Sequence, residues 1–219
     1  MSDAQPVAMN SGRTKGNTGL EAWKRYAFVP VLLTLWAVAV LVGMKTLFDH
    51  ERAAGAAADA PRLWPEKSAL PIEPGTYRLV MLAHPRCPCT RASLSELERL
   101  MTAVKGRANA TVLFVKPKAE LADEWASTDL WTSAGRISGA QAVLDEGGRE
   151  AQLFGAKTSG QALLYSPRGE LLFAGGMTPG RGHEGDNVGV RRIRALIEGG
   201  AIERAVSAVF GCSLFDGAL

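Results

Sequence analysis

"YRLVMLAHPRCPCTRASLSELERLMTAV", residues 77–104, contains the patterns that decide the fold. Its first eight residues form a short apolar run of the kind that becomes a buried strand. Apolar residues then return at the three- and four-residue spacing of a helix, at Leu94, Leu97, Leu100, Met101 and Val104. Cys87 and Cys89, separated only by Pro88, lie between the two patterns. Two of the chain's three cysteines are therefore predicted at a strand-to-helix junction.

The patterns downstream predict strands that alternate with helices. The expected elements are a strand at 110–117, a helix at roughly 119–133, a strand at 140–145, a brief helix ending near Phe154, a β-hairpin at 161–176 and a helix from about Val188. The hairpin is expected to turn at 166–169. Asp186 or Asn187 is positioned to cap the last helix. This order predicts an α/β fold, a mixed sheet flanked by helices, with the hairpin as an antiparallel edge.

Upstream of this domain, residues 26–44 form an apolar run without a charged residue. A helix of that length rises about 28 Å, close to the ~30 Å hydrocarbon core of a bilayer. A buried core helix would need a polar face, and the run is longer than the apolar part of a cleaved signal peptide. We therefore expect one uncleaved transmembrane helix in contact with the lipid bilayer. Four basic residues precede it and two follow it closely, which places residues 1–25 in the cytoplasm.

The remaining chain is expected to divide into three parts. Residues 45–75 are rich in alanine and proline and have no sustained period, which is typical of a tether. The folded domain is expected over 76–210, followed by a tail at 211–219. The net charge of +3 is small, and no basic tract is interleaved with aromatic residues. Binding to nucleic acid therefore has no electrostatic support.

The cysteine pair has three interpretations: an exchanging thiol pair, a metal site, or two small buried residues. A cysteine reacts as its thiolate, which a helix start and nearby positive charge stabilise. Arg86 and Arg91 flank the pair, and Pro88 stiffens the loop. A disulfide between residues two apart would be strained and easily reduced. However, Ser93 and Glu96 fit a capping box, which would start the helix a turn later and weaken the effect of the helix dipole.

Two further stretches carry chemistry-bearing residues. Cys212 follows the final helix and is open to three roles: the second thiol of an intermolecular disulfide, a metal ligand, or an inert small residue. The glycine-rich loop at 175–189 contains His183, but it has no GxxxxGK[ST] pattern and is not a nucleotide P-loop. His183 is a candidate proton carrier or ligand, unless the loop only makes turns. His84 poses the same choice.

The order of elements, with cysteines between the first core strand and the first helix, resembles the thioredoxin-like fold. The resemblance covers about residues 70–210 and is greatest to membrane-tethered bacterial thiol–disulfide oxidoreductases, such as those that serve cytochrome c maturation. Three features depart from that family. One residue rather than two separates the cysteines, Arg86 stands where a tryptophan is common, and the usual cis-proline before the hairpin is replaced by Thr158-Ser159-Gly160.

The resemblance implies roles for these residues. Cys87 would be the attacking thiol and Cys89 would resolve its mixed disulfide. Arg86 would favour the thiolate, and residues 158–160 would contact a partner's chain. The last strand and last helix would place Arg181, His183, Glu184 and Asp186 near the cysteines. The domain would lie on the periplasmic side of a bacterial inner membrane, need no cofactor, and act on extracytoplasmic protein thiols or a membrane electron donor.

Two alternatives use the same fold. Copper chaperones of respiratory oxidase assembly combine a cysteine pair with a distant histidine, and Cu(I) prefers soft thiolate ligands. Here Cys87, Cys89 and His183 would form that set, with Cys212 or His84 as additions. In those chaperones, however, three residues separate the cysteines and the histidine precedes the hairpin. The other alternative is a non-catalytic domain that binds an envelope partner, in which Cys87 and Cys89 would be buried and dispensable.

Overall fold

The computed structural model describes residue 26 and residues 28–71, 75–116, 128–200 and 205–215. The chain divides after Asp49 into two compact units. Helix α2, Phe28–Arg52, has a mean hydropathy of 2.1 over its most apolar window and is long and apolar enough to cross a membrane. It continues past Met44, where the apolar run ends, and Lys45 and Asp49 pair one turn apart on its surface.

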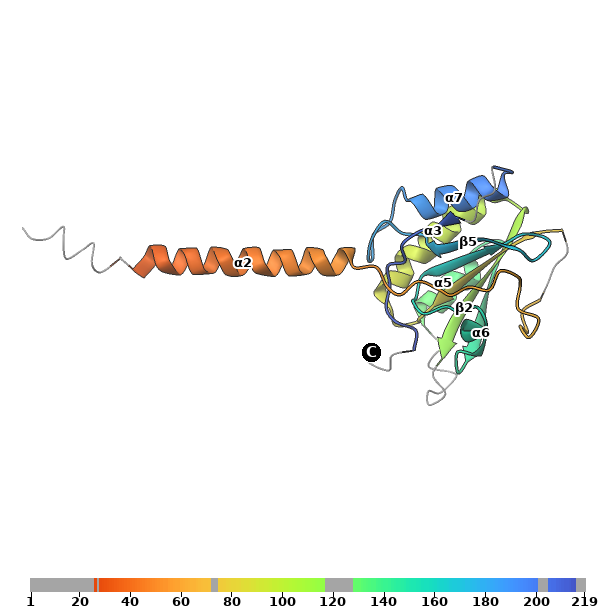
Figure 1. Cartoon of the computed structure of the whole chain (residues 1–219), viewed down its shortest axis with the longest axis horizontal. Coiled ribbons are helices and arrows are strands. Elements are labelled where there is room, and N and C mark those ends of the chain that lie inside the picture. The colour runs from red at the N-terminus through yellow and green to blue at the C-terminus, as the bar shows by residue number, and fades with distance from the viewer. Residues whose placement is uncertain (1–25, 27, 72–74, 117–127, 201–204, 216–219) are drawn as a thin grey trace, which may run out of the picture. The chain divides into compact units, whose positions relative to one another are not determined.

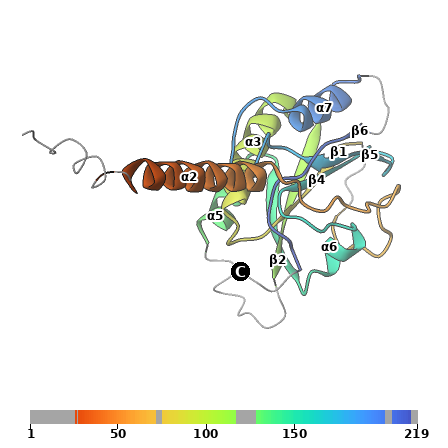
Figure 2. The same ribbon diagram turned by 60° about the vertical axis from the view of Figure 1, so that its left-hand side comes forward.

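The second unit is built on a six-stranded mixed sheet with the order β3-β2-β1-β4-β5-β6 (Figures 1 and 2). The strands are β1 (Tyr77–Ala83), β2 (Ala108–Lys116), β3 (Ala140–Glu146), β4 (Gln161–Tyr165), β5 (Leu171–Gly176) and β6 (Ala205–Val206). Strands β1, β2 and β3 are parallel, β4 is antiparallel to β1 and to β5, and β6 runs parallel to β5. The predicted α/β sheet is confirmed, with β6 as an unpredicted edge strand.

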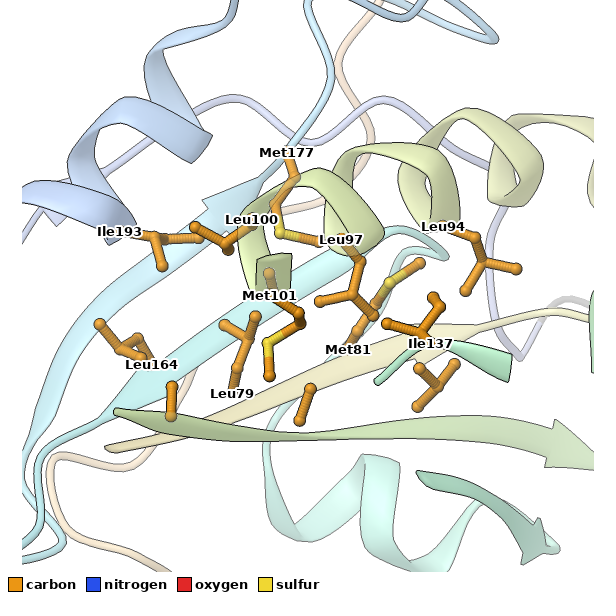
Figure 3. Close-up of a cluster of buried hydrophobic side chains, with 14 of the residues drawn as sticks. Leu79, Met81, Leu94, Leu97, Leu100, Met101, Ile137, Leu164, Met177 and Ile193 are labelled. Carbon is orange, nitrogen blue, oxygen red and sulfur yellow. The ribbon is translucent and has the colours of Figure 1, made fainter. Parts of the chain in front are cut away.

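The helices cover both faces of the sheet. They are α3 (Pro88–Val104), α5 (Asp129–Arg136), α6 (Arg149–Leu153) and α7 (Val188–Ile197). Alternate residues of β1 point to opposite faces, as the pleat of a strand requires. Leu79 and Met81 join a cluster with α3, α5 and α7, whose members face one another in Figure 3. Val80 and Leu82 join a second cluster that includes Ala151 of α6. Burial on both faces explains why β1 reads as a continuous apolar run.

Residues 53–71, expected to be part of a tether, pack against the domain instead. Trp64 is buried and meets the rings of Phe154 and Tyr165 edge-on, at centroid distances of 5.0 and 5.2 Å. Its backbone N–H donates to the carbonyl of Gly169 at the hairpin turn. Ala60 and Leu70 belong to the same apolar cluster. Ala60, Trp64 and Leu70 enter the second core at irregular intervals, so the stretch shows no helical or strand periodicity.

The local predictions differ in outcome. The hairpin forms as expected, and Asn187 caps α7 by accepting from the Val190 N–H at 2.8 Å. The predicted capping box is wrong: α3 starts at Pro88, and Glu96 instead accepts from the Gly185 N–H at 2.6 Å. Part of the helix predicted at 119–133 lies outside the described residues, which contain α5 from Asp129.

Candidate functional site

The cysteine loop connects β1 to α3. Cys87 is the residue immediately before α3 and Pro88 the first within it, a position where a missing N–H costs no helical hydrogen bond. The backbone turns tightly, because the Cys87 N–H donates to the His84 carbonyl at 3.1 Å and the Thr90 N–H to the Cys87 carbonyl at 3.0 Å. Both cysteines are buried, with exposed fractions of 0% for Cys87 and 8% for Cys89. The helix start is therefore at the cysteines, as the thiolate argument requires.

Residues 158–160 lie directly beside this loop. The Gly160 N–H donates to the Leu82 carbonyl at 2.7 Å, and the Ser159 hydroxyl accepts from the His84 N–H at 2.9 Å. Gly160 has φ +83°, and a Cβ on it would lie 2.8 Å from the Ser93 hydroxyl, so that both its conformation and its surroundings favour glycine. The segment before β4 therefore fixes the shape of the cysteine loop.

The C-terminal segment pairs with residues 157–159 through backbone hydrogen bonds. The Ser159 N–H donates to the Cys212 carbonyl at 2.8 Å, and the Leu214 N–H to the Lys157 carbonyl at 2.9 Å. Thr158 and Ser213 form an antiparallel bridge between these two bonds. The edge that the resemblance assigned to a partner's chain is thus paired with this chain's own residues 212–214.

This pairing brings the third cysteine to the first. The Cys212 and Cys87 sulfurs are 2.8 Å apart. Gly211 makes the approach possible, because a Cβ there would lie 1.9 Å from the Ser159 carbonyl oxygen. Of the sequence-predicted residues, Cys87, Cys89, Thr158, Ser159 and Gly160 are gathered with Cys212. In the sequence, Cys212 stood out only because the chain has an odd count of cysteines and because its neighbours are apolar.

The three thiols have different acidities. Burial opposes ionisation of Cys87, but the Cys212 side chain and the N–H groups of Cys212, Cys89 and Thr90 stabilise its thiolate, and together they lower the pKa of Cys87 below its ordinary value. Burial and the neighbouring Cys87 charge raise the pKa of Cys89. Burial, the hydrogen bond to Cys87 and the charge of Cys87 raise the pKa of Cys212 to about 12. Cys87 is the thiol that ionises first.

Arg181, from the glycine-rich loop, supplies the positive charge at this site. Its Nη1 donates to the Gly211 carbonyl at 2.8 Å, and its charge acts to lower the pKa of both Cys89 and Cys212. The arginines beside the pair in sequence are directed elsewhere. Arg86 is exposed and adds to the effect of burial in lowering the pKa of His84, and Arg91 pairs with Asp129 of α5.

The other candidates on the glycine-rich loop have different partners. His183 is exposed, and its Nε2 lies 4.0 Å from a carboxylate oxygen of Glu51. Glu184 pairs with Arg99 and Asp186 with Arg191. Within the described part of the chain, no group of three or more His, Cys, Asp or Glu side chains has an arrangement that could hold a metal ion. The alternative ligand set of Cys87, Cys89 and His183 is therefore not assembled.

Comparison with known proteins supports the fold. No family model matches the sequence, and no curated protein does. Among solved structures, an uncharacterised conserved protein from Geobacillus kaustophilus matches with a TM-score of 0.54 and 16% identity, over 76% of this chain and 94% of that one. A hypothetical protein from Sinorhizobium meliloti matches with a TM-score of 0.53 and 17% identity, over 74% and 93%.

Weaker matches include MTB dsbF in its mixed oxidised and reduced forms, at 14% identity over 56% of this chain and 82% of that one. Copper-bound ScoI of Arabidopsis thaliana matches at 12% identity over 57% and 83%. Both have TM-scores of 0.40. Strand order, strand directions and the position of the cysteine loop agree with the resemblance seen in the sequence. The domain has a thioredoxin-like fold, extended by a sixth strand and by a C-terminal segment that carries a third cysteine.

Proposed function

We propose that this chain is a membrane-tethered thiol–disulfide oxidoreductase in which Cys87 is the attacking thiol and Cys89 belongs to the same redox centre. The observation that carries the proposal is the environment of the Cys87 sulfur. It lies at the start of α3, receives stabilisation from backbone N–H groups, and is the one thiol of the three whose pKa is lowered. A lowered pKa increases the share of Cys87 that is the thiolate, the form that attacks a disulfide.

The surrounding residues hold the thiolate in position. Pro88 fixes the backbone after Cys87, and the N–H groups of Cys89 and Thr90 that follow it stabilise the sulfur. Thr90 donates through its hydroxyl to the His84 carbonyl at 3.1 Å and shares a second hydrogen bond with Ser159. These contacts join the cysteine loop to residues 158–160. In this proposal they keep the sulfur from turning away between successive exchange steps.

The helix α2 supports a location at the membrane. Its apolar length fits the thickness of a bilayer, and the basic residues before it favour a cytoplasmic N-terminus. The thiols would then lie in the oxidising periplasm of a bacterium, where partners with disulfides or thiols occur. Extracytoplasmic protein thiols or a membrane electron donor are the partners that fit this placement.

The two competing interpretations make different demands on the site. A non-catalytic domain is favoured by the burial of Cys87 and Cys89, but a small buried thiol needs no thiolate-stabilising N–H groups. A Cu(I) site needs Cys87 and Cys89 to converge with a third ligand such as His183, and the described residues do not assemble that set. Copper handling would therefore require a rearrangement of the glycine-rich loop.

The test uses the full chain in detergent micelles. Its samples are equilibrated with mixtures of reduced and oxidised dithiothreitol, quenched with acid, and alkylated. A reversible two-electron transition that disappears in Cys87→Ser is expected, together with reduction of insulin disulfides at a rate above that of dithiothreitol alone. Equal rates for the native chain and Cys87→Ser would refute exchange chemistry. In that case, titration of the reduced chain with Cu(I) against a chelator would decide between copper binding and a non-catalytic role.

A further inference from the structure

Two thiols are candidates to pair with Cys87, and their geometries differ. Cys89 lies two residues along the chain, on the first turn of α3. Cys87 itself precedes the helix with an extended backbone, and the Cys89 side chain also forms a hydrogen bond with it, but a disulfide across one intervening residue closes a very small and strained ring. Cys212 comes from a separate segment of the chain, and its sulfur is 2.8 Å from that of Cys87. The residue more distant in sequence therefore brings its sulfur into direct contact with that of Cys87.

The segment that carries Cys212 is held firmly in this position. Both ends are bonded to residues 157–159, through the Cys212 carbonyl and the Leu214 N–H. Arg181 donates to the Gly211 carbonyl, just before the cysteine. Leu214 and Val209 are buried, at 5% and 2% exposure, so the segment is anchored in the core on both sides of the cysteine. Extended peptides bind to an open sheet edge through backbone hydrogen bonds of the same kind. Here such bonds hold the segment beside a reactive thiol.

We propose that Cys212 is the intramolecular disulfide partner of Cys87, and that residues 211–214 form a built-in strand which presents it. The inference rests on the proposed function, since it names the second thiol of the same redox centre. It gives Cys212 a catalytic role, where the sequence also allowed an inert small residue.

The exchange reaction balances with a partner disulfide as the oxidant. The Cys87 thiolate attacks one partner sulfur, the partner's S–S bond breaks, and its other sulfur leaves as a thiolate that takes up a proton. The Cys212 thiolate then attacks the Cys87 sulfur of the mixed disulfide and releases the second partner sulfur as a thiolate, which also takes up a proton. Counting the proton that Cys87 releases when it ionises, Cys87 and Cys212 together lose two electrons and two protons, and the partner's disulfide becomes two thiols. The reverse sequence oxidises a partner dithiol.

The acidities of the two thiols suit this order of steps. While Cys87 is a thiolate, its charge and hydrogen bond hold the proton on Cys212. Formation of the mixed disulfide removes that negative charge, so that Cys212 becomes easier to ionise next to Arg181. The second thiol is therefore activated only after the first has reacted.

Peptide mapping of the oxidised full chain in detergent micelles tests the proposal. Trypsin, used without reduction, places Cys87 and Cys89 together on peptide 87–91 and Cys212 on peptide 205–219. Air-free oxidation with oxidised dithiothreitol is expected to link the two peptides, and the link is expected to persist in Cys89→Ser and vanish in Cys212→Ser. An internal disulfide in peptide 87–91, with Cys212 alkylated, would overturn the inference and leave the proposed function standing. Absence of any Cys87 disulfide would overturn both.

Substitutions at two glycines test whether the built-in strand positions Cys212 for the disulfide. Gly211→Ala places a methyl group against the Ser159 carbonyl, whereas a Cβ at Gly135 of α5 meets nothing within 4 Å. At a fixed ratio of reduced to oxidised dithiothreitol, Gly211→Ala is expected to lower the linked fraction several-fold, and Gly135→Ala to leave it unchanged. Equal linked fractions in both variants would show that the strand does not present Cys212. Circular dichroism of each variant confirms that the compared chains are folded.

Discussion

At the scale of single residues, the Cys87 sulfur owes its acidity to neighbours that the sequence separates widely. The N–H groups of Cys89 and Thr90 come from its own helix, but the Cys212 side chain comes from about 125 residues away. The neighbouring arginines, which the sequence favoured, act on other groups: Arg86 on His84, and Arg91 on Asp129. Charge adjacent in sequence is a poor guide here because long side chains extend toward whichever partner or solvent the fold offers.

The contribution of Cys212 to that acidity can be measured by a pair of substitutions. Cys212→Ala removes the donor that faces the Cys87 thiolate, so we expect the pKa of Cys87 to rise. Cys212→Ser keeps an O–H donor and is expected to raise it less. The measurement is the thiolate absorbance of the reduced chain as a function of pH, with Cys87→Ser to identify the signal. A titration that is the same in all Cys212 variants would contradict the assigned contact.

The same titration has a defined order in the native chain. Because the pKa of Cys87 is lowered, its thiolate signal is expected to appear first as the pH rises, below the ordinary range of a cysteine. Cys89 and Cys212 have raised pKa values, that of Cys212 about 12, and are expected to ionise later. Alkylation that follows the first step should modify Cys87. Modification of Cys89 or Cys212 at the lower pH would reverse the assignment of the attacking thiol.

At the scale of elements, α7 begins directly after the capping residue that the local sequence predicts. Asn187 accepts from the Val190 N–H and donates to the Gly185 carbonyl at 3.0 Å, and it is 6% exposed. Asn187→Ala is expected to destabilise the domain by about 1 kcal/mol, since it leaves an N–H at the helix start without its acceptor. Asn187→Ser, which can still cap, should lose less. Urea unfolding of the detergent-solubilised chain, followed by circular dichroism, compares the two.

The segment before β1 gives a second test at this scale. Trp64→Ala removes the indole that packs between Phe154 and Tyr165 and is expected to cost about 3–5 kcal/mol, the usual range for truncating a large buried aromatic residue. Its neighbour Leu63 is 64% exposed, so Leu63→Ala should change the free energy of unfolding by less than about 0.5 kcal/mol. Similar small effects for both would mean that residues 53–71 act only as a spacer.

The sequence was informative wherever an element is determined by its own pattern. Strand β1, helix α3, the hairpin and the cap of α7 all follow from period, turn residues or a capping side chain within a few positions. The capping box misled because Glu96 is used in a tertiary contact with Gly185, which no local pattern records. The pairing of residues 212–214 with 157–159 was missed for the same reason: a single isolated bridge leaves no periodicity to detect.

At the scale of the whole molecule, the chain combines an apolar helix with a domain in which Cys212, on residues 211–214, contacts the buried Cys87. Because Cys212 covers Cys87, a protein partner has to displace residues 211–214 or deliver a small, exposed disulfide to the centre. Burial of the cysteines, which by itself favours an inert core, is then a property of the resting state. Under the proposed function, residues 211–214 would determine which partners reach Cys87.

Closure of the centre also predicts how oxidation changes stability. A Cys87–Cys212 disulfide closes a loop of about 125 residues, which restricts the unfolded chain, and loops of this length are associated with stabilisation of roughly 4–5 kcal/mol in the chain-entropy model. A Cys87–Cys89 disulfide closes a loop of three residues and restricts the unfolded chain little. Urea midpoints of the oxidised and reduced full chain should therefore differ widely in the native protein and in Cys89→Ser, and differ little in Cys212→Ser. If oxidation shifts the urea midpoint of Cys212→Ser as much as that of the native chain, the stabilising disulfide joins Cys87 and Cys89. Residues 211–214 would then only pack over the cysteine loop.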